Sequence, residues 1–437
     1  MYKLTYYNKI WAIDNENYIL FNSISNAVLK LTKYVYNAIK DGRWNEIDEE
    51  TLSCLLDGYV LIQQDLDGTD IYYYEMLNIK ARKDKIGIFI VPSRTCNLSC
   101  TYCMQNNLFD NKQDVYITKE IIDRYFDWIQ DGLNRWGSRK IDIIFYGGEP
   151  LTTSEEMLIY LIKKFNELSV KPVYGMITNG VNLMKYTEVL KYMNSIKITI
   201  DGNKEVHDSR RIFKDGGGSY DIIINNIKEY LSLSKDKTIT LRMNVDKNNR
   251  DNLLEDIESI ASELPMDQIT VSLNPVDPYE KGINDKIIHG DIRETALAIV
   301  RVSRYLKEKY NIEPKIWRLN CGVSSMCQWS FDTEGSIYKC PALTGEPHRA
   351  VTNIYQSHMN SSFYNIMNRK VGNNECLKCT YLGYCYGGCP RQNELTDDIS
   401  CKKAFFNEYI PQMIEIKYNV HNIFRQNDYQ LLELSGN

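Results

Sequence analysis

The spacing of apolar and polar positions divides the chain into a short amino-terminal region and a longer repeating region. From residue 85 to about 310, apolar runs of strand length alternate with segments in which apolar residues recur at helical spacing. Strands are expected at 86–91, 141–145, 172–177, 196–200, 238–245 and 268–273. Helices are expected near 117–136, 154–168, 182–194, 219–233, 250–262 and 290–310. Six strand–helix units in succession predict an α/β fold with a mostly parallel sheet and right-handed crossovers.

The first 84 residues follow another pattern and are expected to form a separate small domain. Short alternating or apolar runs predict strands at 3–7, 9–13 and 17–21. A helical pattern runs from Val28 to Ile39 and ends near Gly42, and a second short helix is expected at 49–56. Two apolar runs, at 59–63 and 71–75, flank Asp-Leu-Asp-Gly-Thr and predict a hairpin.

Length and charge narrow the class of protein. A chain of 437 residues predicts about two to three domains. The formal net charge of −5 argues against a nucleic-acid partner, which usually requires a basic face. No apolar run is long enough to cross a membrane and no basic-then-apolar leader opens the chain, so we expect no membrane partner and a cytoplasmic location.

The twelve cysteines fall in two groups. Three lie at 96–103, eight lie between 321 and 401, and only Cys54 stands apart. Disulfide scaffolds do not concentrate thiols in this way in a large chain without a leader, so the placement favours metal clusters. Cys54 is flanked by leucines and is expected to be a thiol packed in a core.

Cys96, Cys100 and Cys103 lie on the loop that leaves the first predicted strand of the repeating region, where α/β folds place their chemistry. Three closely spaced thiolates suit an iron–sulfur cluster and leave one iron open to another ligand, because a [4Fe–4S] cube usually takes four. A zinc site would need a fourth nearby ligand, and no other Cys or His lies within about twenty residues. A disulfide would need an oxidising compartment.

The spacing Cys-x3-Cys-x2-Cys, with Tyr102 directly before the last cysteine, resembles that of the radical S-adenosylmethionine (SAM) enzymes. The resemblance implies that the amine and carboxylate of SAM chelate the open iron, and that Tyr102 lies near the adenine. An external one-electron reductant of the flavodoxin or ferredoxin type would then drive cleavage of SAM to a 5′-deoxyadenosyl radical.

Later strand ends carry further residues that match this family. Gly147-Gly-Glu-Pro150 follows the second strand, Thr178-Asn-Gly180 the third, and Thr199 ends the fourth. The resemblance assigns SAM contacts to Gly147, Gly148, Glu149, Thr199 and Arg211. Arg210 is an equally placed alternative to Arg211 for the SAM carboxylate. His207 is expected to be a hydrogen-bonding loop residue, and no histidine metal site or catalytic acid–base residue is identified.

The second group of cysteines resembles the SPASM domain, a twin-cluster extension of radical SAM enzymes. Its centre is Cys376-x2-Cys379-x5-Cys385-x3-Cys389. The resemblance implies two auxiliary clusters, and so three [4Fe–4S] clusters in all. One auxiliary cluster would be held by Cys321, Cys327, Cys340 and Cys389, and the other by Cys376, Cys379, Cys385 and Cys401. A zinc ion at the Cys376–Cys389 set stays an alternative, because four thiolates suit zinc equally well.

The resemblances imply an α/β fold with a partial (β/α)6 radical SAM barrel at 85–312 and a C-terminal iron–sulfur SPASM domain at 313–404. Residues 405–437 are expected to form a C-terminal helix, at 405–424, and a tail. The region 1–84 resembles the winged-helix-like leader-peptide recognition domain of enzymes that modify ribosomally made peptides, in which the leader adds as an extra strand. A dimerising or merely structural role is the alternative for this region.

The function implied is maturation of a precursor peptide with a leader, in which a 5′-deoxyadenosyl radical leads to a thioether or carbon–carbon crosslink. One alternative is an anaerobic sulfatase-type maturase that forms formylglycine. Those relatives lack the front domain, and they have Asp where Pro341 follows Cys340 here. A second alternative is a non-catalytic iron–sulfur electron carrier or redox sensor, which leaves Gly147-Gly-Glu149 unexplained.

Overall fold

The computed structural model describes residues 1–105, 114–278, 281–318, 321–369, 371, 373–396 and 401–420. The chain forms two compact units. The barrel unit comprises residues 80–280 and 321–369, and the terminal unit comprises 1–79, 281–320 and 370–437. The domain boundaries expected at 84, 312 and 404 stay predictions.

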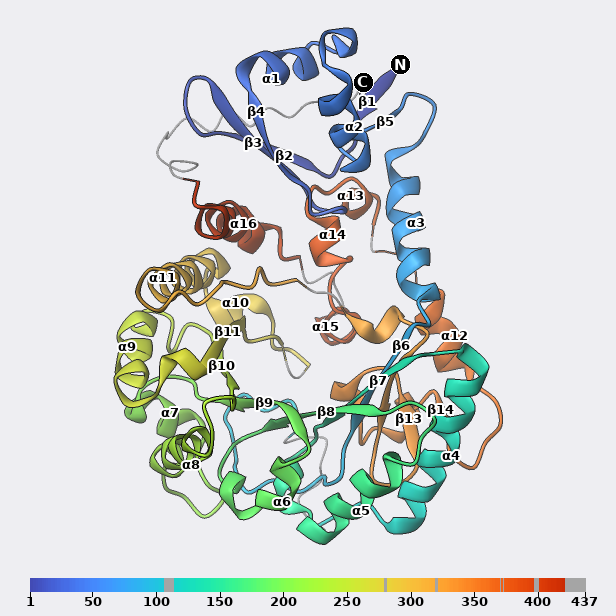
Figure 1. The fold of residues 1–437 in the computed structure, drawn as a ribbon, viewed down its shortest axis with the longest axis vertical. Helices are drawn as coiled ribbons and strands as arrows, with labels where there is room; N and C mark the ends of the chain where they lie inside the picture. Colours follow the sequence, from blue (N-terminus) through green and yellow to red (C-terminus); the bar gives the residue numbers. More distant parts are fainter. Residues whose placement is uncertain are drawn as a thin grey trace. The chain divides into compact units, whose positions relative to one another are not determined.

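The barrel unit is built on the predicted parallel sheet (Figure 1). All six expected strands are present: β6 (Lys85–Ile90), β7 (Lys140–Phe145), β8 (Pro172–Thr178), β9 (Met193–Thr199), β10 (Ile239–Val245) and β11 (Ile269–Pro275). They pair in parallel in the order β11-β10-β9-β8-β7-β6. This confirms the α/β partial-barrel expectation and brings the loops after β6, β7, β8 and β9 to one edge of the sheet.

Helices cover the outer side of this curved sheet (Figure 1). They include α4 (Lys119–Trp136), α5 (Glu155–Phe165), α7 (Lys204–Arg210), α8 (Tyr220–Ser232) and α9 (Leu253–Glu263). Thr118 and Ser154 cap α4 and α5, because each side chain accepts a hydrogen bond from a backbone N–H in the first turn. The helix expected at 182–194 is shorter: η3 (Leu183–Lys185) and α6 (Thr187–Leu190) precede β9, which already begins at Met193.

Three strands that the sequence pattern did not predict extend the sheet beyond β6. They are β12 (Gln328–Phe331), β13 (Ser336–Tyr338) and β14 (Thr352–Asn353). β12 pairs parallel to β6, and β13 pairs antiparallel to both β12 and β14. The barrel sheet therefore continues into the region of the second cysteine group.

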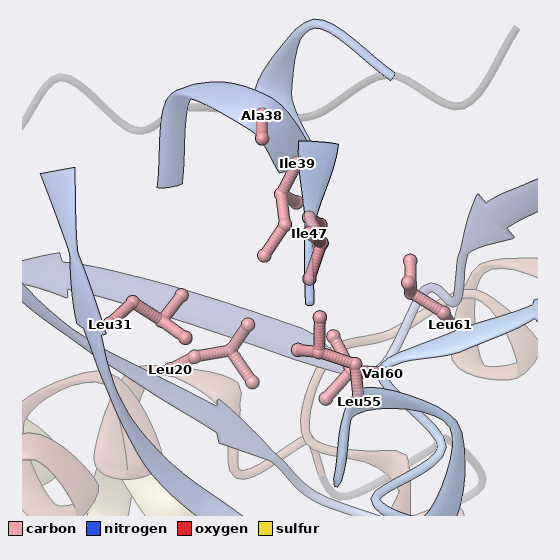
Figure 2. Packing of buried hydrophobic residues seen from close by; sticks show 8 residues of the cluster. All are labelled: Leu20, Leu31, Ala38, Ile39, Ile47, Leu55, Val60 and Leu61. Atoms are coloured by element: carbon pink, nitrogen blue, oxygen red, sulfur yellow. The ribbon is translucent and has the colours of Figure 1, made fainter. Parts of the chain in front are cut away.

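The terminal unit begins with a small β domain. It contains a sheet of β2 (Asn8–Ala12), β3 (Asn17–Asn22) and β4 (Val28–Thr32), and a pair formed by β1 (Tyr2–Leu4) and β5 (Leu61–Gln63). Two helices, α1 (Lys33–Lys40) and α2 (Glu49–Asp57), complete the domain. Figure 2 shows its core, formed by Leu20, Leu31, Ala38, Ile39, Ile47, Leu55, Val60 and Leu61.

Three details of the expected amino-terminal region are wrong. Residues 28–32 form strand β4, and the helix begins only at Lys33, because Thr32 caps it through a hydrogen bond from the Val35 N–H. The expected hairpin strand at 71–75 belongs to helix α3 (Gly68–Ala81). Cys54 is exposed, because α2 turns Leu55 and not Cys54 into the core.

Residues 71–75 are helical because one face of α3 packs against other parts of the terminal unit. Tyr72 and Met76, one helical turn apart, pack with Tyr7 and Leu382 in a second apolar cluster. Tyr73 and Tyr74 stay exposed. Four consecutive bulky residues at 71–74 favour a strand in isolation, so a tertiary contact overrides the local preference here.

The remainder of the terminal unit contains α10 (Asp285–His289), α11 (Ile292–Tyr310) and helices from the carboxyl-terminal part. α13 (Asn374–Leu377), α14 (Leu382–Cys385) and α15 (Pro390–Thr396) lie in the cysteine-rich segment, and α16 (Lys403–Tyr418) packs along α11 (Figure 1). The expected helix at 405–424 is thus α16, and residues 421–424 lie outside the described residues.

The amino-terminal β domain packs directly on the cysteine-bearing helices within the terminal unit. The Tyr7 hydroxyl donates to the Leu377 carbonyl O at 3.0 Å, and the rings of Phe21 and Tyr384 lie 5.4 Å apart. A Cβ at Gly383 would overlap the Ser23 carbonyl O, so only glycine allows this approach. The two segments therefore form one core.

Across the described part of the chain, no helix has the length and apolar character needed to cross a membrane.

Candidate functional site

The loop that leaves β6 carries the first three cysteines. Cys100 is buried, and Cys96 and Cys103 are partly buried. Burial raises the pKa of Cys96 to about 12, with smaller contributions from the nearby Glu149 carboxylate and the other two thiols and an opposing one from the Leu98 N–H. Three neighbouring thiols that repel one another's negative charge need a cation to become thiolates, so this donor set fits an iron–sulfur cluster.

The turn after β7 holds this loop in place. The Gly148 N–H donates to the Ser93 carbonyl O at 3.2 Å, and the Glu149 N–H donates to the Thr95 carbonyl O at 2.9 Å. Gly147 has a φ of 131°, and a Cβ at Gly148 would lie 2.5 Å from the Thr95 carbonyl O. The two glycines are therefore required for the close approach of the β7 turn to the cysteine loop.

The Glu149 carboxylate connects the turn after β7 with the turn after β8. It is buried and accepts hydrogen bonds from the Thr178 hydroxyl at 2.6 Å, the Asn179 N–H at 2.7 Å and the Leu151 N–H at 3.0 Å. Burial raises the pKa of Glu149, and these hydrogen bonds oppose that effect. The Asn179 amide in turn donates to the side-chain oxygen of Asn97 at 2.7 Å. Asn97 directly follows Cys96 in the chain.

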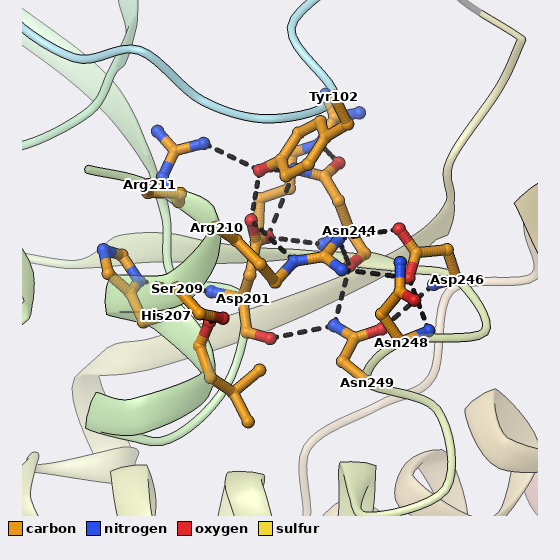
Figure 3. A network of polar contacts seen from close by, with 12 residues as sticks. Tyr102, Asp201, His207, Ser209, Arg210, Arg211, Asn244, Asp246, Asn248 and Asn249 are labelled. Carbon is orange, nitrogen blue, oxygen red and sulfur yellow. Dashed lines mark hydrogen bonds and ion pairs between the residues drawn. The ribbon is translucent and has the colours of Figure 1, made fainter. Parts of the chain in front are cut away.

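Tyr102 belongs to a buried polar network (Figure 3). Its hydroxyl donates to the Asp201 carboxylate and accepts from Arg211 at 2.8 Å and from the Asn244 amide at 3.0 Å. Desolvation raises the pKa of Tyr102 well above its usual range. The network joins the cysteine loop to the ends of β9 and β10, where Asp201 and Asn244 lie.

The two neighbouring arginines make different contacts in this network (Figure 3). Arg210 forms a two-point ion pair with Asp246, at 2.9 and 3.0 Å, and its guanidinium lies 4.9 Å from the centre of the Tyr102 ring. Arg211 is 8% exposed and donates to the Tyr102 hydroxyl. The Nε atoms of both arginines have no hydrogen-bond partner among the described residues, but Arg210 also has ion pairs with Asp201 and Asp246, and no ion pair within that part of the chain joins Arg211 to a carboxylate. Arg211 is therefore the guanidinium with donor capacity left for an anionic ligand.

His207 and Thr199 lie beside these arginines. The His207 Nδ1 accepts from the Asp201 N–H at 3.4 Å, and its Nε2 lies 3.0 Å from the Ser219 hydroxyl, which donates to the Arg211 carbonyl O at 2.7 Å. Burial lowers the pKa of His207 to about 3, so the ring is neutral at pH 7. This agrees with the expected hydrogen-bonding role, but His207 lies in helix α7 and not in a loop. Thr199 is buried at the end of β9.

Three cysteines of the second group lie in the barrel unit. Cys327 directly precedes β12, and the Gly87 N–H of β6 donates to its carbonyl O at 2.9 Å. Because β12 runs parallel to β6, Cys327 lies beside the start of β6, whereas the loop with Cys96 follows its end. Cys340 follows β13, whose antiparallel pairing with β12 returns it to the Cys327 end of the sheet. Cys321 precedes η5 (Gly322–Ser324).

The other five cysteines lie in the terminal unit. Cys379 interacts electrostatically with Cys376 and Cys401, and Cys385 interacts with Cys379 and Cys401. Burial raises the pKa of Cys385 to about 11. These four thiols are the set that the resemblance assigns to one auxiliary cluster, and that assignment stays a prediction. Cys389 precedes α15.

Within the described residues, no three Cys, His, Asp or Glu side chains converge closely enough to hold a single metal ion.

Sequence reasoning assigned no role in the site to Asp201, Asn244 or Asn179, although Asn179 lies within the Thr178-Asn-Gly180 match. Asp201-Gly202 and Asn179-Gly180 have the appearance of ordinary turns. Their positions in the chain could have indicated them. Asn179 and Asp201 each follow a strand of one parallel sheet, and Asn244 lies near the end of the next strand. Which side chains would meet there depends on the register of these strands.

The family model of the radical SAM superfamily matches residues 90–260 of the chain. Among curated proteins, the chain is 25% identical over 375 residues to the cysteine-type anaerobic sulfatase-maturating enzyme of Clostridium novyi (strain NT), covering 75% of this chain and 96% of the relative. It is 22% identical over 419 residues to the radical SAM cyclopropyl synthase TigE of Paramaledivibacter caminithermalis, covering 86% of this chain and 83% of that protein.

Two solved structures share the fold. Histidine-tagged anSMEcpe with bound AdoMet has a TM-score of 0.61 at 19% identity, covering 76% of this chain and 95% of that one. Streptococcus suis SuiB bound to precursor peptide SuiA has a TM-score of 0.52 at 15% identity, covering 89% of this chain and 95% of that one. These similarities confirm the expected partial barrel with an amino-terminal small β domain and a carboxyl-terminal cysteine-rich region.

Proposed function

We propose, from the premise that this chain is a radical SAM enzyme related to the sulfatase-maturating enzymes and to SuiB, that it closes a thioether or carbon–carbon crosslink in a ribosomally synthesised precursor peptide.

The proposal that the chain is an enzyme rests on how the residues at one edge of the parallel sheet are arranged. The Cys96–Cys103 loop, the Gly147-Gly-Glu149 turn and Arg211 lie at one edge of the parallel sheet and are joined through hydrogen bonds. A [4Fe–4S] cluster with SAM would supply a 5′-deoxyadenosyl radical that abstracts hydrogen from an unactivated carbon. In this proposal Cys96, Cys100 and Cys103 hold that cluster.

The protein residues around it bind and orient SAM. Arg211 pairs with the SAM carboxylate through its unused donors, and Glu149 accepts from the SAM amine while its bonds to Thr178 and Asn179 keep the carboxylate fixed. Tyr102 lies beside the adenine, with its hydroxyl anchored to Asp201. The burial of these side chains excludes water from the radical.

Crosslink closure removes two hydrogens from the peptide. The radical takes one as a hydrogen atom, and the second leaves as a proton and an electron when the new bond forms. The proposed auxiliary clusters, at Cys321, Cys327, Cys340 and Cys389 and at Cys376, Cys379, Cys385 and Cys401, would accept this electron. A flavodoxin- or ferredoxin-type partner would supply the electron that starts each turnover.

The amino-terminal β domain offers strand edges for a leader peptide. β2 and β4 are the outer strands of its three-stranded sheet, among the described residues. An extended peptide could add to either edge through backbone hydrogen bonds. The structure of SuiB was determined with its precursor peptide, and its fold matches a larger share of this chain than that of anSMEcpe, 89% against 76%.

Formylglycine formation is the second candidate, because the sulfatase-maturating enzymes show the higher identity and TM-score. The residue after Cys340 argues against it. The resemblance places an Asp that the mechanism of those enzymes uses directly after the matching cysteine, whereas this chain has Pro341 there. We therefore place crosslinking first.

The test uses the enzyme reconstituted anaerobically with iron and sulfide. It is incubated with SAM, dithionite and each short peptide encoded beside its gene, and the products are analysed by mass spectrometry. We expect 5′-deoxyadenosine and a peptide lighter by two hydrogens that does not react with hydrazide. A hydrazide-reactive product would show an aldehyde and favour formylglycine.

The matched control replaces Cys96, Cys100 and Cys103 together with Ala. This variant should retain about eight of about twelve irons and form no 5′-deoxyadenosine, because only the SAM-cleaving cluster is lost. SAM cleavage by the triple variant would contradict the central assignment.

A further inference from the structure

We propose that Lys339 is a positioning residue for the auxiliary cluster assigned to Cys321, Cys327 and Cys340, and that its ammonium fixes the Cys327 turn and places a positive charge beside the cluster. The inference rests on the proposed cluster, and nothing in the family comparison assigns a role to this lysine.

Lys339 is buried at the end of β13, directly before Cys340. Its side chain is 1% exposed. Its Nζ donates to the carbonyl O atoms of Ser325 and Gln328, each at 2.5 Å. These two carbonyls lie on either side of Cys327, so the lysine joins the backbone before Cys340 to the turn that carries Cys327.

The aromatic surroundings hold the ammonium in this position. Nζ lies 4.0 Å from the centre of the Trp329 ring, which is itself buried and stacked on the rings of Trp136 and Phe363. A cation over an indole face is a favourable contact, and more so away from water. The position of the charge is thus set by β12 and β13 as well as by the two carbonyls.

The charge of Lys339 has no acidic partner in the described part of the chain. No ion pair joins it to a carboxylate there. Burial lowers the pKa of Lys339 to about 7, and the neighbouring thiols of Cys327 and Cys321 act in the opposite direction. A buried charge without compensation is strongly unfavourable, so the site is suited to a group of net negative charge. A [4Fe–4S] cluster held by thiolates has this property.

A fixed positive charge beside such a cluster favours its reduced form, which carries one more negative charge. Removal of the charge should therefore move the midpoint potential of that cluster to a more negative value. The SAM-cleaving cluster would hardly change, because Cys96 follows the opposite end of β6 and the strand rises about 3.3 Å per residue.

The experiment compares three variants of the reconstituted full-length enzyme. Lys339→Met removes the charge and the donors, and Lys339→Gln removes the charge but keeps two N–H donors. Lys378→Met is the control, because Lys378 also directly precedes an assigned cluster cysteine, Cys379, but is exposed. Iron content and redox titrations followed by electron paramagnetic resonance are measured for each.

We expect one auxiliary midpoint to shift negatively in both Lys339 variants and none to shift in Lys378→Met. Loss of about four irons in Lys339→Met, with SAM cleavage retained, would also support the role, through the Cys327 turn. Full iron with unchanged midpoints would overturn it. Loss of soluble protein in both Lys339 variants would overturn it as well, since Lys339 would then serve the fold. A wild-type enzyme with only about eight irons would overturn the cluster assignment itself.

Discussion

At the scale of single residues, the structure separates two arginines that the sequence could not. Arg210 and Arg211 are adjacent and equally placed after the fourth barrel strand, and both are buried. Arg210 is paired with Asp246 at two points, whereas no ion pair joins Arg211 to a carboxylate among the residues that the structure describes. Only the contact made by the loop after β10 distinguishes them, and that contact depends on strand register.

We predict that Arg211→Gln weakens SAM binding roughly 10- to 100-fold, the usual loss for a hydrogen bond to a charged group. Anaerobic calorimetry of SAM binding to the reconstituted enzyme would measure this. Arg210→Gln should instead lower the thermal midpoint, because Asp246 would be left buried without its partner. If Arg211→Gln binds SAM as tightly as the wild type, the carboxylate contact lies elsewhere.

At the scale of elements, the barrel was predictable and the flanking regions were not. The six barrel strands are largely apolar runs because the strands of a covered parallel sheet are buried on both faces, and such runs are visible in a sequence. β12 to β14 are two to four residues long, and β12 begins with a glutamine, so no pattern identifies them. Residues 28–32 and 71–75 were assigned wrongly because short apolar runs suit either period.

The residues of the candidate site also divide into those that the sequence indicated and those that it did not. The cysteines and the Gly-Gly-Glu turn were singled out from the sequence because spacing and residue type mark them, and their roles stay predictions. Asp201, Asn244 and Lys339 become visible only when the strands are placed side by side, because their partners are up to 142 residues away in the chain.

The turn after β7 gives an element-scale prediction. Gly148→Ala should push the cysteine loop away, because its Cβ would meet the Thr95 backbone and not a side chain that can move aside. We expect loss of most 5′-deoxyadenosine formation and of up to about four irons. Gly137→Ala is the control. This left-handed cap of α4 has open space around it, so the substitution should cost roughly 1 to 2 kcal/mol of stability and leave the iron content unchanged. Normal SAM cleavage by Gly148→Ala would contradict the proposed bracing.

At the scale of the whole molecule, the amino-terminal domain and the last cysteines share a core. Gly383 lies against the Ser23 carbonyl, and Tyr384 against Phe21. Deleting the amino-terminal domain would therefore uncover the helices that carry Cys376 and Cys385. Such a deletion would not by itself show whether the domain binds a leader.

A single substitution tests this shared core. Gly383→Ala should lower the iron content by up to about four per chain and lower the thermal midpoint, because the added Cβ meets a backbone carbonyl. SAM cleavage without peptide should persist, since Cys96 to Arg211 all belong to the barrel unit. Iron analysis and 5′-deoxyadenosine formation distinguish these outcomes. Wild-type iron content and an unchanged midpoint would show that the two segments are independent.

The shared core also sets an order of events during synthesis. The hydroxyl of Tyr7 is bonded to Leu377, 370 positions later, and translation proceeds at about 5 to 20 residues per second. The apolar surface formed by Tyr7 and Phe21 therefore waits roughly 20 to 75 s on the ribosome before its partner emerges. The amino-terminal domain is therefore made first but completes its core among the last parts of the chain. During the interval its exposed apolar surface needs protection by a chaperone.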